Sequence, residues 1–360
     1  MDGPQGPWLC VDGQRVLGLC SNNYLGLAGH PALAAAARAA LEVDGTGSGA
    51  SRQISGNMRA HRQAEQALAH FIHQPRSALF ATGYACNVGV VQALVDAGDV
   101  IFSDRLNHAS LIDGARLSRA KVVVYEHADA SDLEQKLKLH RPSGRGALVL
   151  TESLFSMDGD VPPLIDIAKL ARDHGAGLLV DEAHALGVMG PYGSGLCPEL
   201  GVRPDVTVGT LGKAFGAQGA FAAGSDATVE LVRNRARSYI FSTAPAPALA
   251  AVALAGLRLV RDGDGLRATL RARSARLRSG LRALDFHVPL GDSPIIPVMV
   301  GESEPTMALS RALFDQGVFV HGVRPPTVPQ GTGRLRVVPM ASHSDDDISE
   351  ALRAFAAVRR

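Results

Sequence analysis

Asp205-Val-Thr-Val-Gly209 is a short apolar run that passes directly into Thr210-Leu-Gly-Lys213-Ala-Phe-Gly216. A short apolar run bounded by polar and glycine residues predicts a buried β-strand. A second apolar run, residues 177–180, ends in the same way in Asp181-Glu-Ala-His184. In an open α/β sheet, ligands bind at the carboxyl ends of the strands. Lys213 follows one of these runs and Asp181 follows the other, so we expect both residues to belong to one ligand site.

Similar apolar runs recur along the first part of the chain, separated by helix-like segments. The runs lack the alternation of apolar and polar residues, which is typical of strands buried on both faces. Strands that alternate with helices predict an α/β fold with a mostly parallel central sheet and helices on both of its faces. The expected strands are residues 77–80, 100–102, 121–125, 147–151, 177–180, 205–209 and 220–224, and the expected helices are residues 87–95, 108–117, 133–139, 164–172 and 244–260.

From about Leu266 the pattern changes to that of a smaller α+β domain. We expect an N-terminal segment (residues 1–25), a large domain (26–262) and a small C-terminal domain (263–360). The elements expected in the small domain are a helix within 267–282, a strand at 295–300, a helix at 307–316, strands at 318–320 and 334–338, and a last helix from residue 345.

Composition favours a globular enzyme. The chain has 360 residues, of which 46% are hydrophobic, and a formal net charge of +1, which argues against a disordered or nucleic-acid-binding protein. The four cysteines form no C-x-x-C pair, and no basic region followed by an apolar stretch opens the chain, so we expect a cytoplasmic protein with reduced thiols. Prolines interrupt the most apolar segment, residues 244–260, which suits a core helix better than a membrane span. We expect no metal site.

The pairing of Lys213 with Asp181 has a specific chemical meaning. A lysine amine forms a Schiff base with an aldehyde cofactor, and an aspartate keeps a pyridine nitrogen protonated, so that the ring accepts electrons. Each residue alone is more often a solvated loop lysine or a helix cap. Together, at the ends of two neighbouring strands, they predict a pyridoxal phosphate (PLP) site.

Two histidines flank strand ends at the same expected edge. His184 lies three residues after Asp181, within reach of the phenolic oxygen of the cofactor, and His108 opens an expected helix, where it could stack on the ring. An isolated histidine is more often a surface or core residue. Because both histidines are expected at the same edge of the sheet, contact with the cofactor is favoured for both.

A phosphate group requires backbone N–H donors at a helix N-terminus, with hydroxyl groups nearby. Residues 81–87 follow an expected strand and open a helix, so their backbone N–H groups are candidate donors to a phosphate. Three hydroxyl side chains elsewhere in the chain are further candidates. These candidates are Gly83, Tyr84, Thr210, Ser242 and Thr243.

The glycine-rich run Gly45-Thr-Gly-Ser-Gly49-Ala-Ser-Arg-Gln-Ile-Ser-Gly56-Asn57 is not a P-loop, because no lysine follows its glycines. We expect a flexible loop that lets the backbone approach a ligand closely. A plain surface loop is the alternative.

Four motifs together resemble the α-oxoamine synthases, which are fold-type I PLP enzymes that condense an amino acid with an acyl thioester and release carbon dioxide. The motifs are Thr210-Leu-Gly-Lys213, Asp181-Glu-Ala-His184, Ser156-Met-Asp-Gly-Asp160 and Asn107-His-Ala-Ser110. The resemblance runs from Ser21-Asn-Asn-Tyr-Leu-Gly-Leu27 to the final helix.

The resemblance implies a role for each matching residue. Lys213 carries the cofactor and removes the Cα proton, while Asp181 pairs with the pyridine nitrogen. The other implied contacts are His184 and Ser156 at the phenolic oxygen, His108 on the ring face, Gly83, Tyr84 and Thr210 elsewhere on the cofactor, Ser242 and Thr243 at the phosphate bound by the neighbouring subunit, Asn22 and Arg336 at the amino-acid carboxylate, and Thr327 at the acyl substrate. A homodimer with shared active sites is therefore implied.

Within the family, residues 323–336 are most similar to the member that joins L-alanine to a pimeloyl thioester, carried by coenzyme A or by a carrier protein, in biotin synthesis. The alternatives are a glycine C-acetyltransferase, a 5-aminolevulinate synthase, a sphingoid-base-type synthase or a secondary-metabolite acyltransferase. Family members also carry an N-terminal helix with an acyl-binding arginine before the segment that opens this chain, so we expect either a truncation relative to the family or a different mode of acyl-substrate capture.

Two rival functions come from other classes. A non-catalytic partner subunit would lack the lysine that is present at position 213. A dinucleotide-binding protein would carry G-x-G-x-x-G between a first strand and its helix, and the sequence has no such motif there.

Overall fold

The structure is a computed structural model that describes residues 1–141 and 144–359. It contains two compact units. The small unit consists of Met1–His30, Ser156–Asp160 and Gly263–Arg360, and the large unit consists of Pro31–Phe155 and Val161–Asp262.

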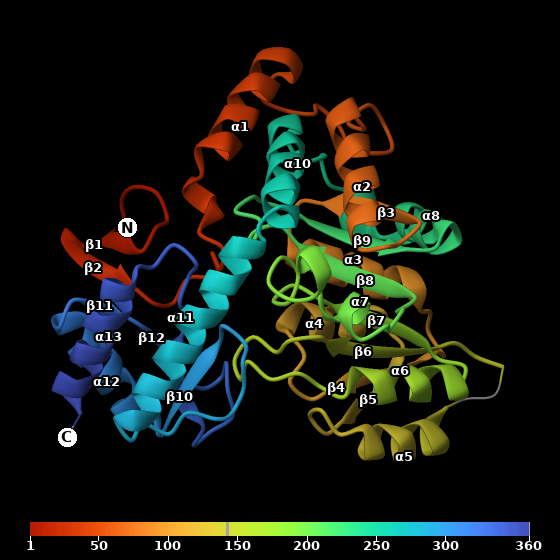
Figure 1. The fold of residues 1–360 in the computed structure, drawn as a ribbon. Coiled ribbons are helices and arrows are strands. Elements are labelled where there is room, and N and C mark those ends of the chain that lie inside the picture. Colours follow the sequence, from red (N-terminus) through yellow and green to blue (C-terminus); the bar gives the residue numbers. More distant parts are fainter. Residues whose placement is uncertain (142–143, 360) are drawn as a thin grey trace. The chain divides into compact units, whose positions relative to one another are not determined.

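The large unit is built on a seven-stranded sheet with the strand order β3-β9-β8-β7-β6-β4-β5 (Figure 1). All neighbouring strands are parallel except at β9, which is antiparallel to both β3 and β8. The mostly parallel sheet predicted from the apolar runs is therefore confirmed. The strands are β3 (Arg76–Phe80), β4 (Val100–Asp104), β5 (Lys121–Tyr125), β6 (Ala147–Glu152), β7 (Gly177–Asp181), β8 (Val206–Thr210) and β9 (Ala220–Gly224).

Both faces of this sheet are covered. Successive residues of β7, Leu178, Leu179 and Val180, point to alternate faces, and all three are buried. One face packs against α3 and α4 in a core that includes Val90 and Leu111. The helices of this unit are α1 (Pro31–Asp44), α2 (Arg59–Phe71), α3 (Gly83–Leu94), α4 (Ala109–Leu117), α5 (Ala130–His140), α6 (Leu164–Asp173), α7 (Leu196–Glu199), α8 (Asp226–Arg235), α9 (Arg237–Ile240) and α10 (Pro247–Arg261), with a 3₁₀ turn η2 at Pro191–Gly193.

One expected helix begins earlier than the sequence suggested. We expected a helix at residues 87–95, whereas α3 starts at Gly83. Thr82 caps it, because the Thr82 side chain accepts a hydrogen bond from the Ala85 N–H at 3.1 Å. The N-terminus of α3 therefore lies directly after β3, as residues 81–87 were expected to lie, at the edge where the ligand site was predicted.

The small unit contains two three-stranded sheets, β1-β2-β11 and β10-β13-β12. Its core includes Leu277, Val298 and Phe355. Its elements are β1 (Trp8–Val11), β2 (Gln14–Gly18), the 3₁₀ turn η1 (Leu27–Gly29), α11 (Asp264–Ala283), β10 (Ile296–Gly301), α12 (Ser303–Asp315), β11 (Val318–Phe319), β12 (His321–Val323), β13 (Gly333–Val337) and α13 (Asp345–Val358).

The two structural units differ from the expected domains in where the N-terminal segment belongs. Residues 1–25 were expected to stand apart, but β2 pairs in parallel with β11, with Leu17 opposite Val318. Leu17 and Val318 are both fully buried, so the segment contributes to the small core. Among the helices of residues 1–141 and 144–359, none is both long enough and apolar enough to cross a membrane.

Candidate active site

Lys213 lies in the connection between β8 and β9, which two backbone hydrogen bonds close into a compact turn. The Leu211 N–H donates to the Gly219 carbonyl and the Ala217 N–H to the Leu211 carbonyl, each at 2.9 Å. Gly187 packs against this turn, and a Cβ at that position would lie 2.6 Å from the Ala214 Cβ. The closed turn and the packing at Ala214 fix the backbone from which the Lys213 side chain starts.

Asp181 is the last residue of β7 and is buried. One carboxylate oxygen accepts the Ala183 N–H at 2.9 Å, and the other accepts the side-chain amide of Asn87 at 2.7 Å. Asp181 is also in register with Val208 of the neighbouring parallel strand β8. The aspartate and the lysine turn therefore stand at the ends of adjacent strands, as the sequence predicted.

His108 caps α4, and its ring belongs to the same polar network. The Ser110 N–H donates to His108 Nδ1 at 3.3 Å, and Ser110 Oγ also bonds Asn87, which in turn bonds Asp181. Burial lowers the pKa of His108, and the positive charge of Lys213 acts in the same direction. His108 is nevertheless exposed, and a neutral imidazole is suited to stacking on an aromatic ring.

Glu152 is a site residue that the sequence analysis missed. It ends β6, opposite Asp181 in the sheet register, and one carboxylate oxygen accepts the His108 N–H at 2.6 Å. Burial, with the nearby Asp181 charge as the second cause, raises the pKa of Glu152 to about 8. The available signal was an acid at the end of an apolar run, the same signal that revealed Asp181.

Glu182 is a second buried acid that we had not assigned, and it fixes the segment after β7. Its carboxylate accepts hydrogen bonds from Ser153 Oγ at 2.7 Å and from the N–H groups of Leu196 and Cys197 at 3.0 and 2.6 Å. Burial raises the pKa of Glu182. His184, two residues further on, is buried in the segment that this carboxylate anchors.

The N-terminus of α3 and the end of β8 form a cradle for an anion. Gly83 and Tyr84 open the helix, where the first N–H groups have no partner inside the helix. A Cβ on Gly83 would lie 2.7 Å from Thr210 Cγ2, so the helix start contacts the end of the strand. Within the described residues, the buried Thr210 hydroxyl has no hydrogen-bond partner. A phosphate would satisfy these donors, so the residues present fit PLP.

Ser242 and Thr243 lie in the segment between α9 and α10, beside the glycine-rich loop. Thr243 forms an antiparallel bridge with Ser51, and the Ala244 N–H donates to the Ala50 carbonyl at 2.9 Å. Ser242 is half-buried and Thr243 is exposed in the single chain.

Three other predicted residues come together in the small unit. Arg336 on β13 donates through Nε to the Ser156 carbonyl at 2.6 Å. The hydroxyl of Tyr24, a residue the sequence analysis did not assign, lies 3.5 Å from the Arg336 guanidinium and 3.4 Å from the Asn22 side-chain oxygen. Thr327 is exposed, and its N–H donates to the Arg324 carbonyl at 3.1 Å. The structure thus groups Asn22, Ser156 and Arg336 around one buried tyrosine.

Comparison with known proteins identifies the family. The model of the aminotransferase class I and II family matches residues 14–355. The chain belongs to this family. An 8-amino-7-oxononanoate synthase from Geobacter sulfurreducens is 48% identical over 360 residues, which cover 99% of this chain and 92% of that protein.

Solved structures of the family support the same placement. A serine palmitoyltransferase variant from S. paucimobilis with bound PLP is 33% identical, with a TM-score of 0.95 and coverage of 98% of this chain and 90% of that one. An 8-amino-7-oxononanoate synthase from Francisella tularensis is 29% identical, with a TM-score of 0.81 and coverage of 95% and 97%. The predicted fold class and the resemblance to α-oxoamine synthases are confirmed.

Proposed function

We propose that this protein joins L-alanine to a pimeloyl thioester, with loss of carbon dioxide, and so makes 8-amino-7-oxononanoate for biotin synthesis. The observation that carries this function is the 48% identity with an 8-amino-7-oxononanoate synthase across 99% of the chain. The site agrees with it, because Lys213 and Asp181 follow adjacent parallel strands.

PLP is the cofactor, and we assign most of its contacts to residues of the large unit. Asp181 would pair with the ring nitrogen, His108 would cover one ring face, and Thr210 and the first N–H groups of α3 would bind the phosphate. When bound, PLP supplies an electron sink for the charge that develops at the amino-acid Cα. Lys213 is the group that would remove the Cα proton, and the buried carboxylate of Asp181 would stabilise the positive ring.

The amino-acid carboxylate is assigned to Arg336 and Asn22. A guanidinium grips a carboxylate through two parallel hydrogen bonds, which a lysine cannot match. The bonds from Arg336 Nε to the Ser156 carbonyl and from Nη2 to the Tyr24 hydroxyl orient the guanidinium. We assign Ser156 and His184 to the phenolic oxygen of the cofactor, and Thr327 to the acyl substrate.

A homodimer follows from the assignment of Ser242 and Thr243 to the phosphate of the neighbouring subunit. Two large apolar side chains flank these residues and the loop that pairs with them: Phe241 is 72% exposed and Ile54 is 79% exposed. Burial of these two side chains against a second subunit would remove apolar surface from water. The four cysteines are free thiols, which suits the reducing cytoplasm.

Thiol release tests the reaction directly. Purified protein is incubated with pairs drawn from several acyl-CoAs and amino acids, and free coenzyme A and the mass of the product are measured. Pimeloyl-CoA with L-alanine should be the best pair, and Lys213→Ala should release none. Absence of an amino-ketone product from every pair would reject the condensation itself.

One observation favours a second candidate within the same family. The serine palmitoyltransferase structure superposes with a TM-score of 0.95, against 0.81 for the Francisella 8-amino-7-oxononanoate synthase. Faster turnover of palmitoyl-CoA with serine, or of acetyl-CoA with glycine, would replace the biotin assignment by another α-oxoamine synthase activity.

A further inference from the structure

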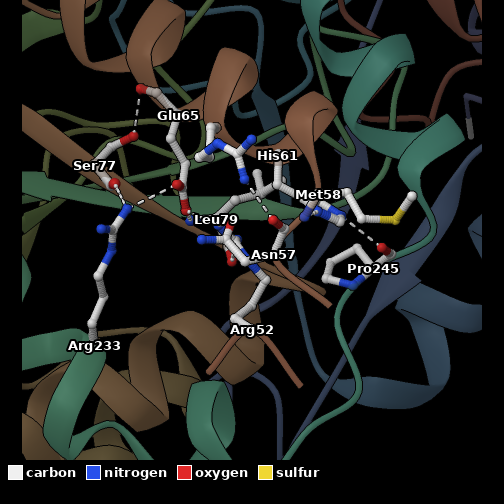
Figure 2. Close-up of polar contacts among 10 residues, drawn as sticks. Arg52, Asn57, Met58, His61, Glu65, Ser77, Leu79, Arg233 and Pro245 are labelled. Atoms are coloured by element: carbon white, nitrogen blue, oxygen red, sulfur yellow. Dashed lines mark hydrogen bonds and ion pairs between the residues drawn. The ribbon is translucent and has the colours of Figure 1, made fainter. Parts of the chain in front are cut away.

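A buried ion-pair network lies beneath the glycine-rich loop. Glu65 on α2 stands between two arginines, with Arg52 at 2.9 Å and Arg233 at 2.8 Å from its two carboxylate oxygens (Figure 2). The Arg52 and Glu65 side chains are only 2% and 5% exposed. The Leu79 N–H of β3 also donates to Glu65 at 2.8 Å. Breaking a buried pair leaves an uncompensated charge, so such a network holds its members in one arrangement.

Arg52 fixes the shape of the loop above this network. Its guanidinium donates to the Asn57 side chain at 2.9 Å and to the Leu79 carbonyl of β3. A Cβ on Gly56 would lie 2.0 Å from the Ala50 carbonyl oxygen, so the two arms of the loop meet where only glycine fits. The flexible loop expected from the glycine content is thus a compact turn tied to the sheet.

This turn and His61 together hold the segment that follows Ser242 and Thr243. The carbonyl of Pro245 accepts a hydrogen bond from His61 Nε2 at 2.7 Å (Figure 2). It accepts a second one from Ser48 Oγ, also at 2.7 Å. The other ring nitrogen of His61 accepts the Met58 N–H at 3.1 Å. His61 is fully buried, and its burial lowers its pKa, which keeps the ring in the neutral form that can accept at Nδ1.

We propose that His61, supported by the Arg52–Glu65 pair, is a positioning residue for the cofactor phosphate: it fixes the backbone at Pro245 and thereby the hydroxyl groups of Ser242 and Thr243. The inference rests on the proposed phosphate contact of these two residues. Holding donors in the bound geometry before binding removes the entropy cost of ordering them, so His61 acts on affinity without touching the cofactor.

Binding of two cofactor forms separates this role from a general structural one. Apoprotein of the wild type and of His61→Leu is titrated with PLP and with pyridoxal, which lacks the phosphate, and binding is followed by visible absorbance. His61→Leu keeps an apolar side chain of similar size in the buried position. Loss of one or two hydrogen bonds should raise the Kd for PLP about fivefold to tenfold. The Kd for pyridoxal should stay unchanged.

Three further variants sharpen the test. His61→Gln, which offers both a donor and an acceptor, should restore most of the affinity for PLP. His70→Leu is the matched control, because His70 is an exposed residue of the same helix and should leave both affinities unchanged. Ser48→Ala removes the second donor to Pro245 from a half-buried surface position, and should weaken PLP binding in the same direction without endangering the fold.

A double-variant comparison distinguishes failure of this inference from failure of the proposed phosphate contact. If His61 acts through Ser242 and Thr243, adding His61→Leu to the Ser242→Ala/Thr243→Ala variant should weaken PLP binding no further. Equal weakening of PLP and pyridoxal by both His61→Leu and Ser48→Ala would overturn the positioning role. If the Ser242→Ala/Thr243→Ala variant itself binds PLP as the wild type does, the phosphate contact fails and the inference fails with it.

Discussion

Lys213 is the residue on which the whole assignment depends. Lys213→Ala should abolish turnover, because the variant has neither the amine that carries the cofactor nor the base for the Cα proton. Borohydride treatment of the wild type should fix the cofactor to residue 213, as peptide mass spectrometry can establish. Lys169→Ala is a suitable control, since Lys169 pairs with Asp173 on the surface. An adduct on any other lysine would falsify the assignment.

Asp181 should matter through its charge more than through its hydrogen bonds. Asp181→Asn can still bond a ring nitrogen and should bind some PLP, but an amide cannot stabilise the positive ring. Removing one electrostatic group of this kind from an active site typically costs about 3–4 kcal/mol, so kcat should fall roughly 10²- to 10³-fold. Steady-state kinetics checks this, with the surface variant Asp173→Asn as control. Rates near those of the wild type would reject the role.

Residues at the ends of apolar runs were visible in the sequence, whereas their supporting partners were not. Asp181 stands out because it ends an apolar strand, and Lys213 because it follows another apolar strand by three residues. Asn87 donates one hydrogen bond to Asp181, which lies 94 positions further along the chain, and another to Ser110, which lies 23 positions further along. Contacts at such separations depend on strand order, which apolar periodicity does not specify.

At the scale of elements, Glu152 links the end of β6 to the start of α4 and should make stability depend on pH. The pKa of Glu152 rises from 4.5 to about 8 on folding. Below the lower value the carboxyl is protonated in both states. Between the two values the folded state keeps a proton that the unfolded state releases, so the free energy of unfolding falls as pH rises, by up to about 1.4 kcal/mol per pH unit.

Glu152→Gln removes this titration. Relative to the wild type, the apoprotein of the variant should become progressively more stable as the pH is raised from about 5 to about 8. Urea unfolding of both apoproteins across that range measures the difference. Glu199→Gln, at an exposed position, should run parallel to the wild type. A constant difference between Glu152→Gln and the wild type would show that Glu152 is not held protonated.

Strands were predicted more completely than helices and edge elements. The runs at residues 121–125 and 220–224 coincide with β5 and β9. β9 is buried at every position and is therefore apolar throughout, whereas β5 is an edge strand whose Val122 and Val124 are exposed, and its β-branched residues carry the signal. The start of α3 was misplaced because a glycine at the first helical position has poor helix propensity, and its cap at Thr82 is the stronger signal. The short strands β1 and β2 were not predicted, since four or five residues that are only partly buried carry little apolar pattern.

At the scale of the whole molecule, the chain order does not reveal the units. Residues 156–160 interrupt the large unit in sequence but belong to the small one, where Arg334 pairs with Asp158 and Ser293 donates to the Gly159 carbonyl at 2.6 Å. Arg336 holds Ser156 in the same way. These partners lie more than a hundred residues downstream, so no local sequence pattern indicates that residues 156–160 belong to the small unit.

In the proposed homodimer each active site combines residues of both subunits, and a hybrid dimer can test which subunit supplies each part. If Ser242 and Thr243 serve the neighbour, a hybrid of Lys213→Ala with Ser242→Ala/Thr243→Ala contains one site with neither defect and one with both. Differently tagged subunits allow the hybrid to be purified, and it should regain about half of the wild-type activity per dimer, as a twofold assembly of two sites requires. If the hydroxyls served their own subunit instead, both hybrid sites would carry a defect. The hybrid would then be no more active than its parents, and the shared site would have to be abandoned even if the protein is dimeric.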